Sequence, residues 1–150
     1  SKAYANGKFA TAGDAQFVLS VLRQLTDTSA FTAVEMFLDG GATAGAGTQR
    51  LILPNNSVWT FDILVTSRRT DAVGGAAGYR FVGVIRKDTT AGSATFVGTP
   101  SKTVIGETNT GWDAAITADT TNGALKVTVT GETAKTIRWV ATVQIAQVTN

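Results

Sequence analysis

Hydrophobic and polar residues alternate along most of this chain, in short runs that turn-forming residues separate. A period of two puts apolar side chains on one face of the runs at 58–67, 112–118 and 137–145, as in strands. No segment sustains the 3.6-residue period of an amphipathic helix. The pattern therefore predicts an all-β fold, an antiparallel β-sandwich or barrel-like domain of about nine or ten strands.

The chain divides into two parts by composition. Residues 1–16 are small and polar apart from Tyr4 and Phe9, and we expect them to form an extended arm or linker. Residues 17–150 hold the strand-like runs and form one predicted domain. Because the chain begins at Ser1 and its first residues lack an apolar signal segment, we expect a piece of a longer protein.

Several runs are apolar on both faces, namely those at 17–22, 61–65 and 81–85. One face of each strand must meet the core, and the other must meet a second sheet or another chain. A single sandwich of 150 residues has few layers with which to cover them all. The pattern therefore favours an oligomer.

Composition excludes several kinds of chemistry. The chain has no Cys, which removes disulfides, thiolate catalysis and Cys-zinc sites, and no His, the usual general base. The net charge is only +2 and no basic tract occurs, so nucleic acid is not an expected partner. No apolar stretch approaches the roughly 18–20 residues that cross a bilayer, so we expect no membrane insertion. We predict no catalytic residues, no metal and no cofactor.

Two segments carry weaker chemical signals. Asp113 is the most suggestive carboxylate for a glycosidase pair, although an alternating strand also explains it as an exposed residue. Residues 119–123 superficially resemble a calcium loop but lack its further acids. A turn in which Asp119 and Asn122 bond nearby backbone is the simpler interpretation.

Aromatic side chains on a β surface can stack on sugar rings. Trp59 and Trp139 lie in the middle of apolar runs and are expected in the core. Trp112 and Tyr79 stand at strand entrances beside loops, and a core position is the alternative for both. Loops on a rigid scaffold often carry recognition, and those available are residues 40–49, 70–78, 87–93 and 108–112. A glycan site needs a stacking face beside polar groups, so the predicted site is Trp112, Asp113, Tyr79 and Arg69.

Several segments together resemble a known family. They are YANGKFA at 4–10, GDAQ at 13–16, LDG at 38–40, LILPNNSVWTF at 51–61, RRTD at 68–71, DTTNG at 119–123 and KTIRW at 135–139. The chain resembles the C-terminal domain of tail fibre proteins of tailed bacteriophages, most closely fibres of phages that infect Acinetobacter. The resemblance covers nearly the whole chain, and residues 51–61 are its most specific part.

The resemblance implies a homotrimer at the distal end of a virion fibre, made in the host cytoplasm. It implies binding of a bacterial surface polysaccharide, either capsule or lipopolysaccharide, with the arm at 1–16 continuing from the fibre shaft. It assigns no role to any single residue. Two alternatives stay open: an enzyme, as the end domain of a capsule-depolymerising tailspike, and a purely structural cap that trimerises a fibre.

Overall fold

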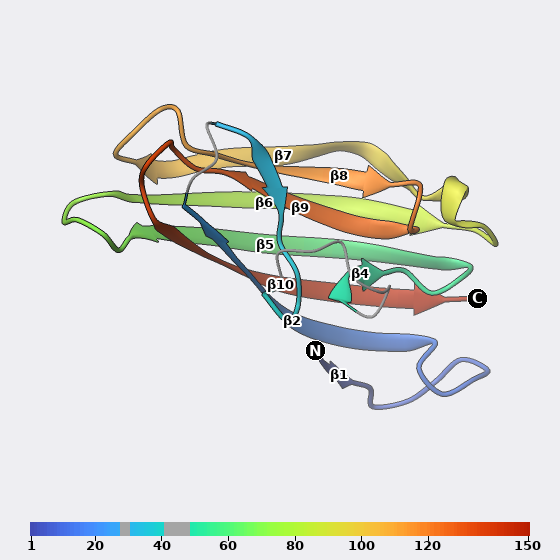
Figure 1. Ribbon diagram of the computed structural model, residues 1–150. Helices are drawn as coiled ribbons and strands as arrows, with labels where there is room; N and C mark the ends of the chain where they lie inside the picture. The colour runs from blue at the N-terminus through green and yellow to red at the C-terminus, as the bar shows by residue number, and fades with distance from the viewer. Residues whose placement is uncertain (28–30, 41–48) are drawn as a thin grey trace.

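The computed structural model describes residues 1–27, 31–40 and 49–150, which form two antiparallel sheets facing each other (Figure 1). The larger sheet has the order β1-β2-β10-β5-β6-β7, and in the smaller one β9 pairs with β3 and β4 on one side and β8 on the other. The strands are β1 Lys2–Tyr4, β2 Ala15–Thr26, β3 Ala33–Glu35, β4 Leu51–Ile52, β5 Ser57–Arg69, β6 Ala76–Lys87, β7 Thr95–Glu107, β8 Asp113–Asp119, β9 Ala124–Thr130 and β10 Ile137–Thr149. The predicted all-β, antiparallel character is confirmed, and the arrangement is compatible with a β-sandwich.

The described residues contain no α-helix, and η2 at Ala91–Ser93 is a 3₁₀ turn. No helix in that part of the chain has the length and apolar character needed to cross a membrane.

The core lies between the two sheets and follows the alternation of the long strands. Along β5 and β10 every second side chain is buried, including Phe61, Ile63 and Val143. Trp59 and Trp139 are buried as predicted, and each indole N–H has a partner. Trp59 Nε1 donates to Gln147 Oε1 at 2.8 Å, and Trp139 Nε1 donates to Thr26 Oγ1 at 2.9 Å. These bonds offset the cost of burying the two polar N–H groups.

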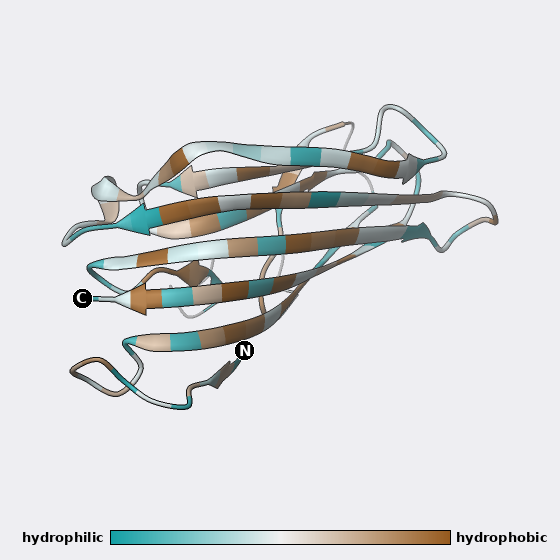
Figure 2. Ribbon diagram, turned by 180° about the vertical axis from the view of Figure 1, so that it is seen from behind, coloured by the Kyte–Doolittle hydropathy of each residue, from teal (hydrophilic) through white to brown (hydrophobic). Residues whose placement is uncertain are grey.

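The larger sheet turns its second face away from the smaller sheet, and we call this the outer face (Figure 2). The outer face accounts for the runs that are apolar on both faces, because many of the large apolar side chains on this face are exposed. They are Phe17, Val21, Leu25, Val58, Leu64, Val82, Val97, Ile105, Val140 and Val148. In Figure 2 apolar and polar bands alternate along each strand of the larger sheet.

The N-terminal segment begins with a short strand that pairs within its own chain. Strand β1 pairs with β2 of the same chain, and the rings of Tyr4 and Phe17 stack with centroids 6.2 Å apart. The following turn is held by the buried carboxylate of Asp14, which accepts backbone N–H bonds of 2.7 to 3.0 Å from Phe9, Ala10 and Thr11. These N–H bonds, led by those of Ala10 and Thr11, lower the pKa of Asp14. Strand β1 joins the sheet through backbone pairing with β2. It is too short to show a periodic pattern in the sequence.

Strand β7 is continuous, although its sequence shows two separate short apolar runs, at 95–97 and 103–105. Gly98, at φ +73°, and Pro100 interrupt the apolar pattern between them. They fall where the pairing with β6 shifts register between Val82 and Val84. An edge strand tolerates such a bulge and a proline, since its far side needs no ladder hydrogen bonds.

Candidate functional site

Connections between strands gather at one end of the sandwich, on the left in Figure 1, and we call this the loop end. It comprises residues 70–75, 108–112 and 131–136, together with Phe31 just before β3. The N–H of Thr108 donates to the carbonyl oxygen of Ala76 and the N–H of Ala76 to Thr108 Oγ1, both at 3.0 Å. The N–H of Thr70 donates to the Thr136 carbonyl oxygen at 2.8 Å. Two of the predicted recognition loops, 70–78 and 108–112, therefore lie side by side.

The other two predicted loops lie elsewhere. Residues 87–93 are at the opposite end of the sandwich, where β6 ends and β7 begins. Of the loop at 40–49, residues 41–48 fall outside the described residues.

Two of the predicted site residues belong to the core. Trp112 is 2% exposed and packs on Trp139 with ring centroids 6.2 Å apart, and Tyr79 is fully buried. The Tyr79 hydroxyl lies 2.9 Å from Glu107 Oε2 and 3.0 Å from the Trp112 carbonyl oxygen. Burial, and then the hydrogen bond with Glu107, raises the pKa of Tyr79. Because both rings are buried, neither has a free face on which a sugar could stack. Both are core residues, as the alternative interpretation of the sequence expected.

The other two predicted site residues are charged, and each is paired with a different partner. Asp113 is exposed and forms an ion pair with Lys102 of β7. Arg69 forms a forked pair with Asp71, in which Nε and Nη2 donate to the two carboxylate oxygens at 2.8 and 3.0 Å. Asp71 Oδ1 also accepts the Thr136 N–H at 3.1 Å. The Arg69 guanidinium, and then this N–H, lower the pKa of Asp71 to about 2. Arg69 and Asp71 thus tie residues 70–75 to residues 131–136.

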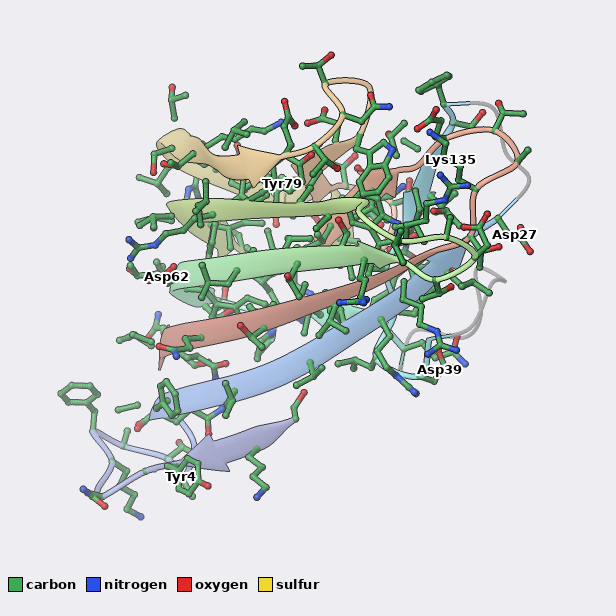
Figure 3. The ribbon with its side chains drawn as sticks, turned by 90° about the vertical axis from the view of Figure 1, so that its left-hand side faces the viewer. Tyr4, Asp27, Asp39, Asp62, Tyr79 and Lys135 are labelled. Atoms are coloured by element: carbon green, nitrogen blue, oxygen red, sulfur yellow. The ribbon has the colours of Figure 1, made fainter. Side chains whose placement is uncertain are left out.

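Glu132 joins the remaining connections of the loop end. Its Oε2 accepts the Trp112 indole N–H at 3.0 Å and the Asn109 amide at 2.8 Å, and its Oε1 accepts Lys135 Nζ at 2.6 Å. The pKa of Glu132 is lowered, first by Lys135 and then by Trp112. Figure 3 shows Lys135 and Asp27 on one side of the molecule and Asp62, an outer-face residue, on the other. Glu132 was not predicted from the sequence, because two of its partners, Asn109 and Trp112, lie 20 or more residues away in another connection.

Phe31 was also missed, because the apolar run at 31–38 makes it look like the first residue of a strand. Strand β3 begins at Ala33 instead, and Phe31 is 55% exposed with φ at +37°. It lies against Gly111, where an added Cβ would stand 2.6 Å from Phe31 Cε1. Of the two aromatic rings described at the loop end, Phe31 keeps an open face and Trp112 does not. A non-glycine residue in this backbone region costs about 1–3 kcal/mol, which the surrounding structure must offset.

The loop end offers chemistry suited to binding a polar ligand. An open aromatic ring lies beside amide, carboxylate and ammonium groups that hydrogen bonds hold in place, a combination typical of carbohydrate sites. Across the described ranges, no group of three or more His, Cys, Asp or Glu side chains is arranged to hold a metal ion. The turn at 119–123 is closed by Asp119, whose Oδ1 accepts the N–H groups of Thr121 and Asn122, as the turn interpretation predicts.

Models of known protein families and well-characterised proteins yield no match to this chain.

Proposed function

We propose that this chain is the receptor-binding end domain of a phage tail fibre, which recognises a bacterial surface polysaccharide and carries out no catalysis. The observation that carries the proposal is the construction of the loop end. The carboxylates of Asp71 and Glu132 fix three connections to one another, so the exposed ring of Phe31 is presented on a preorganised surface. Preorganisation reduces the entropy lost when a flexible glycan binds. The fibre resemblance gives the class of ligand.

We infer further that the domain acts as a homotrimer and that the outer face joins the copies. Five strands of 12 or 13 residues form most of this face. At about 4.8 Å between strands and about 3.3 Å per residue, they cover roughly 900 Å². A standard interface buries about 800 Å² on each partner, which is close to the area of the whole face rather than of either half.

Exposed apolar side chains occur along the whole outer face, and five of them, Phe17, Val58, Val82, Val97 and Val148, lie in the half away from the loop end. Cross-strand pairing there brings together Val58 with Val148, Phe17 with Ala146, and Val84 with Val97. We assign the contact between copies to this half, which leaves the loop ends free to bind. Three linked weak sites raise avidity by about 10²–10⁴ over one site.

The test is the binding of fluorescently labelled chain to a panel of Acinetobacter cells and to unrelated bacteria. We expect binding to particular strains and competition by their extracted polysaccharide. Phe31→Ala should weaken binding while leaving the fold and solution mass unchanged, because it removes the open ring. Phe9→Ala is the matched control, since Phe9 is 80% exposed and lies outside the loop end.

Three results would contradict the proposal. A trimer that binds no cells would favour the structural cap, which the apolar outer face also supports. Release of reducing ends from the polysaccharide would make the domain a depolymerase. Equal binding by Phe31→Ala and the parent would remove Phe31 from the site.

A further inference from the structure

Two arginines on the outer face stand side by side. Arg68 of β5 and Arg138 of β10 are direct cross-strand neighbours, and both are exposed. Within the described chain, neither guanidinium has a hydrogen bond or an ion pair. Like charges directly opposite each other destabilise a strand pair. The Arg68–Arg138 pairing therefore destabilises the sheet locally, and a bound anion would reduce the repulsion between the two guanidinium groups.

Other arginines of the chain have acidic partners. Arg69, Arg80 and Arg86 each form a salt bridge with a nearby aspartate. Arg80 lies on the same outer face and is held by Asp62 through two hydrogen bonds of 3.0 and 2.7 Å. The sequence thus supplies acids to outer-face arginines elsewhere but not to Arg68 and Arg138.

A hollow of about 260 Å³ adjoins the arginine pair. Arg138 forms one wall and Arg23 of β2 another, with the apolar side chains of Leu25 and Val140 between them. The Arg23 guanidinium donates to the Asp39 carbonyl oxygen at 2.8 Å, which holds Arg23 at the wall. Asp39 adds one carboxylate to the lining. With Arg68 beside it, the region carries three cations against that one anion.

We propose that this region binds a sugar unit that carries a carboxylate, so that the domain selects an acidic polysaccharide. The inference rests on the proposed function and names its substrate class. The planar forks of Arg68 and Arg138 match the two oxygens of a carboxylate. Leu25 and Val140 give the apolar face of the sugar ring a surface to pack on. The hollow is slightly below the ~300 Å³ lower limit of ligand pockets, which suits one sugar unit.

This site and the contact between copies occupy different halves of the outer face. The arginine pair lies in the row nearest the loop end, because Arg138 is the second residue of β10 and Arg68 the penultimate residue of β5. The pairs assigned to the trimer contact, such as Val58 with Val148, lie at the other end of the same strands. A glycan chain that contacts Phe31 therefore has an acidic-sugar site on the same end of the domain.

The experiment uses the intact chain and surface polysaccharide extracted from cells that it binds. The polysaccharide is offered before and after chemical reduction of its carboxyl groups to alcohols. Arg68→Gln/Arg138→Gln removes the guanidinium pair. Lys2→Gln/Lys8→Gln removes two exposed cations from the N-terminal segment and controls for net charge.

We expect the parent to bind the native polysaccharide at least about tenfold more tightly than the reduced form, as loss of charge-assisted hydrogen bonds predicts. The double glutamine variant should lose a similar factor, whereas the lysine control should bind like the parent. Added salt should weaken binding by the parent, because the sites are exposed. If the glutamine variant does not fold, Arg68→Lys/Arg138→Lys replaces it as the test of the guanidinium pair. It keeps the charge but lacks the fork, so it should still bind more weakly.

Equal binding of native and reduced polysaccharide would overturn the acidic-sugar inference and leave the proposed function intact. So would parental binding by a folded variant of the arginine pair. A changed solution mass for that variant would mean that the pair contacts a second copy instead. A chain that binds neither cells nor polysaccharide would overturn the proposed function itself.

Discussion

At the scale of single residues, Asp71 is the acid that joins two connections of the loop end. Its carboxylate receives the forked Arg69 guanidinium and the Thr136 N–H, and these contacts need the ionised form. They hold the pKa of Asp71 at about 2, below the value of 3.8 that describes an unperturbed aspartate. A pKa lowered by folding stabilises the folded state above the unfolded value, and the stabilisation disappears as pH falls through the folded value.

We therefore predict that part of the loss of stability in acid comes from Asp71, between about pH 4 and pH 2. Asp71→Asn should be less stable than the parent at neutral pH, and its melting temperature should fall less over that window. The measurement is melting temperature against pH, with Asp113→Asn as the control because Asp113 lies outside this network. Parallel curves for Asp71→Asn and the parent would refute this account of Asp71.

At the scale of elements, the connection from β9 of the smaller sheet to β10 of the larger one passes close to the core. Gly131 begins this crossing and is buried. A Cβ added at Gly131 would collide with Thr26 Oγ1 and lie 3.3 Å from Ile137 Cδ1. The same Thr26 hydroxyl accepts the indole N–H of Trp139. The close approach of the chain at Gly131 therefore keeps a core hydrogen bond in place.

Gly131→Ala should lower the free energy of unfolding by about 1–3 kcal/mol, because a methyl group forced into a packed core displaces Thr26. Gly92→Ala is the control, since an added Cβ there meets nothing within 4 Å. Its effect should stay within about 0.5 kcal/mol. Denaturant unfolding of both variants measures the difference. A neutral Gly131→Ala would show that the crossing can relax.

Strand positions were largely predictable because the core depends on local alternation. The runs that contain Ile63 and Val143 were correctly placed, since one buried face imposes a period of two on any strand. Strand β1 and the continuity of β7 were not predictable. The first is only three residues long, and the other continues through a bulge at Pro100.

The candidate site was predictable only in part. The sequence indicated that the loops at 70–78 and 108–112 carry recognition, and the structure brings them together. It did not distinguish a core aromatic from an exposed one at a strand entrance. Trp112 is buried because Gly75 lets the ring approach the backbone: a Cβ there would lie 2.7 Å from Trp112 Cη2. Such a contact across 37 positions leaves no local pattern.

For the whole molecule, we propose that the outer face serves both assembly and recognition. Its half away from the loop end is assigned to contacts between copies, and its loop-end half carries Arg23, Arg68 and Arg138. Monomeric proteins rarely leave large apolar surfaces open to water, and the exposed apolar side chains of this face favour a contact with another copy.

Val58→Glu should dissociate the trimer without unfolding the chain. Val58 lies in the half away from the loop end, directly across from Arg86, whose guanidinium can form an ion pair with the new carboxylate. Val73→Glu is the control, because Val73 is 94% exposed in the 70–75 connection. Circular dichroism should stay unchanged for both variants, while only Val58→Glu changes the solution mass. A trimeric Val58→Glu would place the contact on another surface.

Assembly through the outer face is the central claim, and the solution mass of the unmodified chain tests it most directly. Light scattering during size-exclusion chromatography measures that mass independently of shape. The account predicts a particle three times the mass of the 15.6-kDa chain, stable on dilution. A stable monomer at the same concentrations would contradict it.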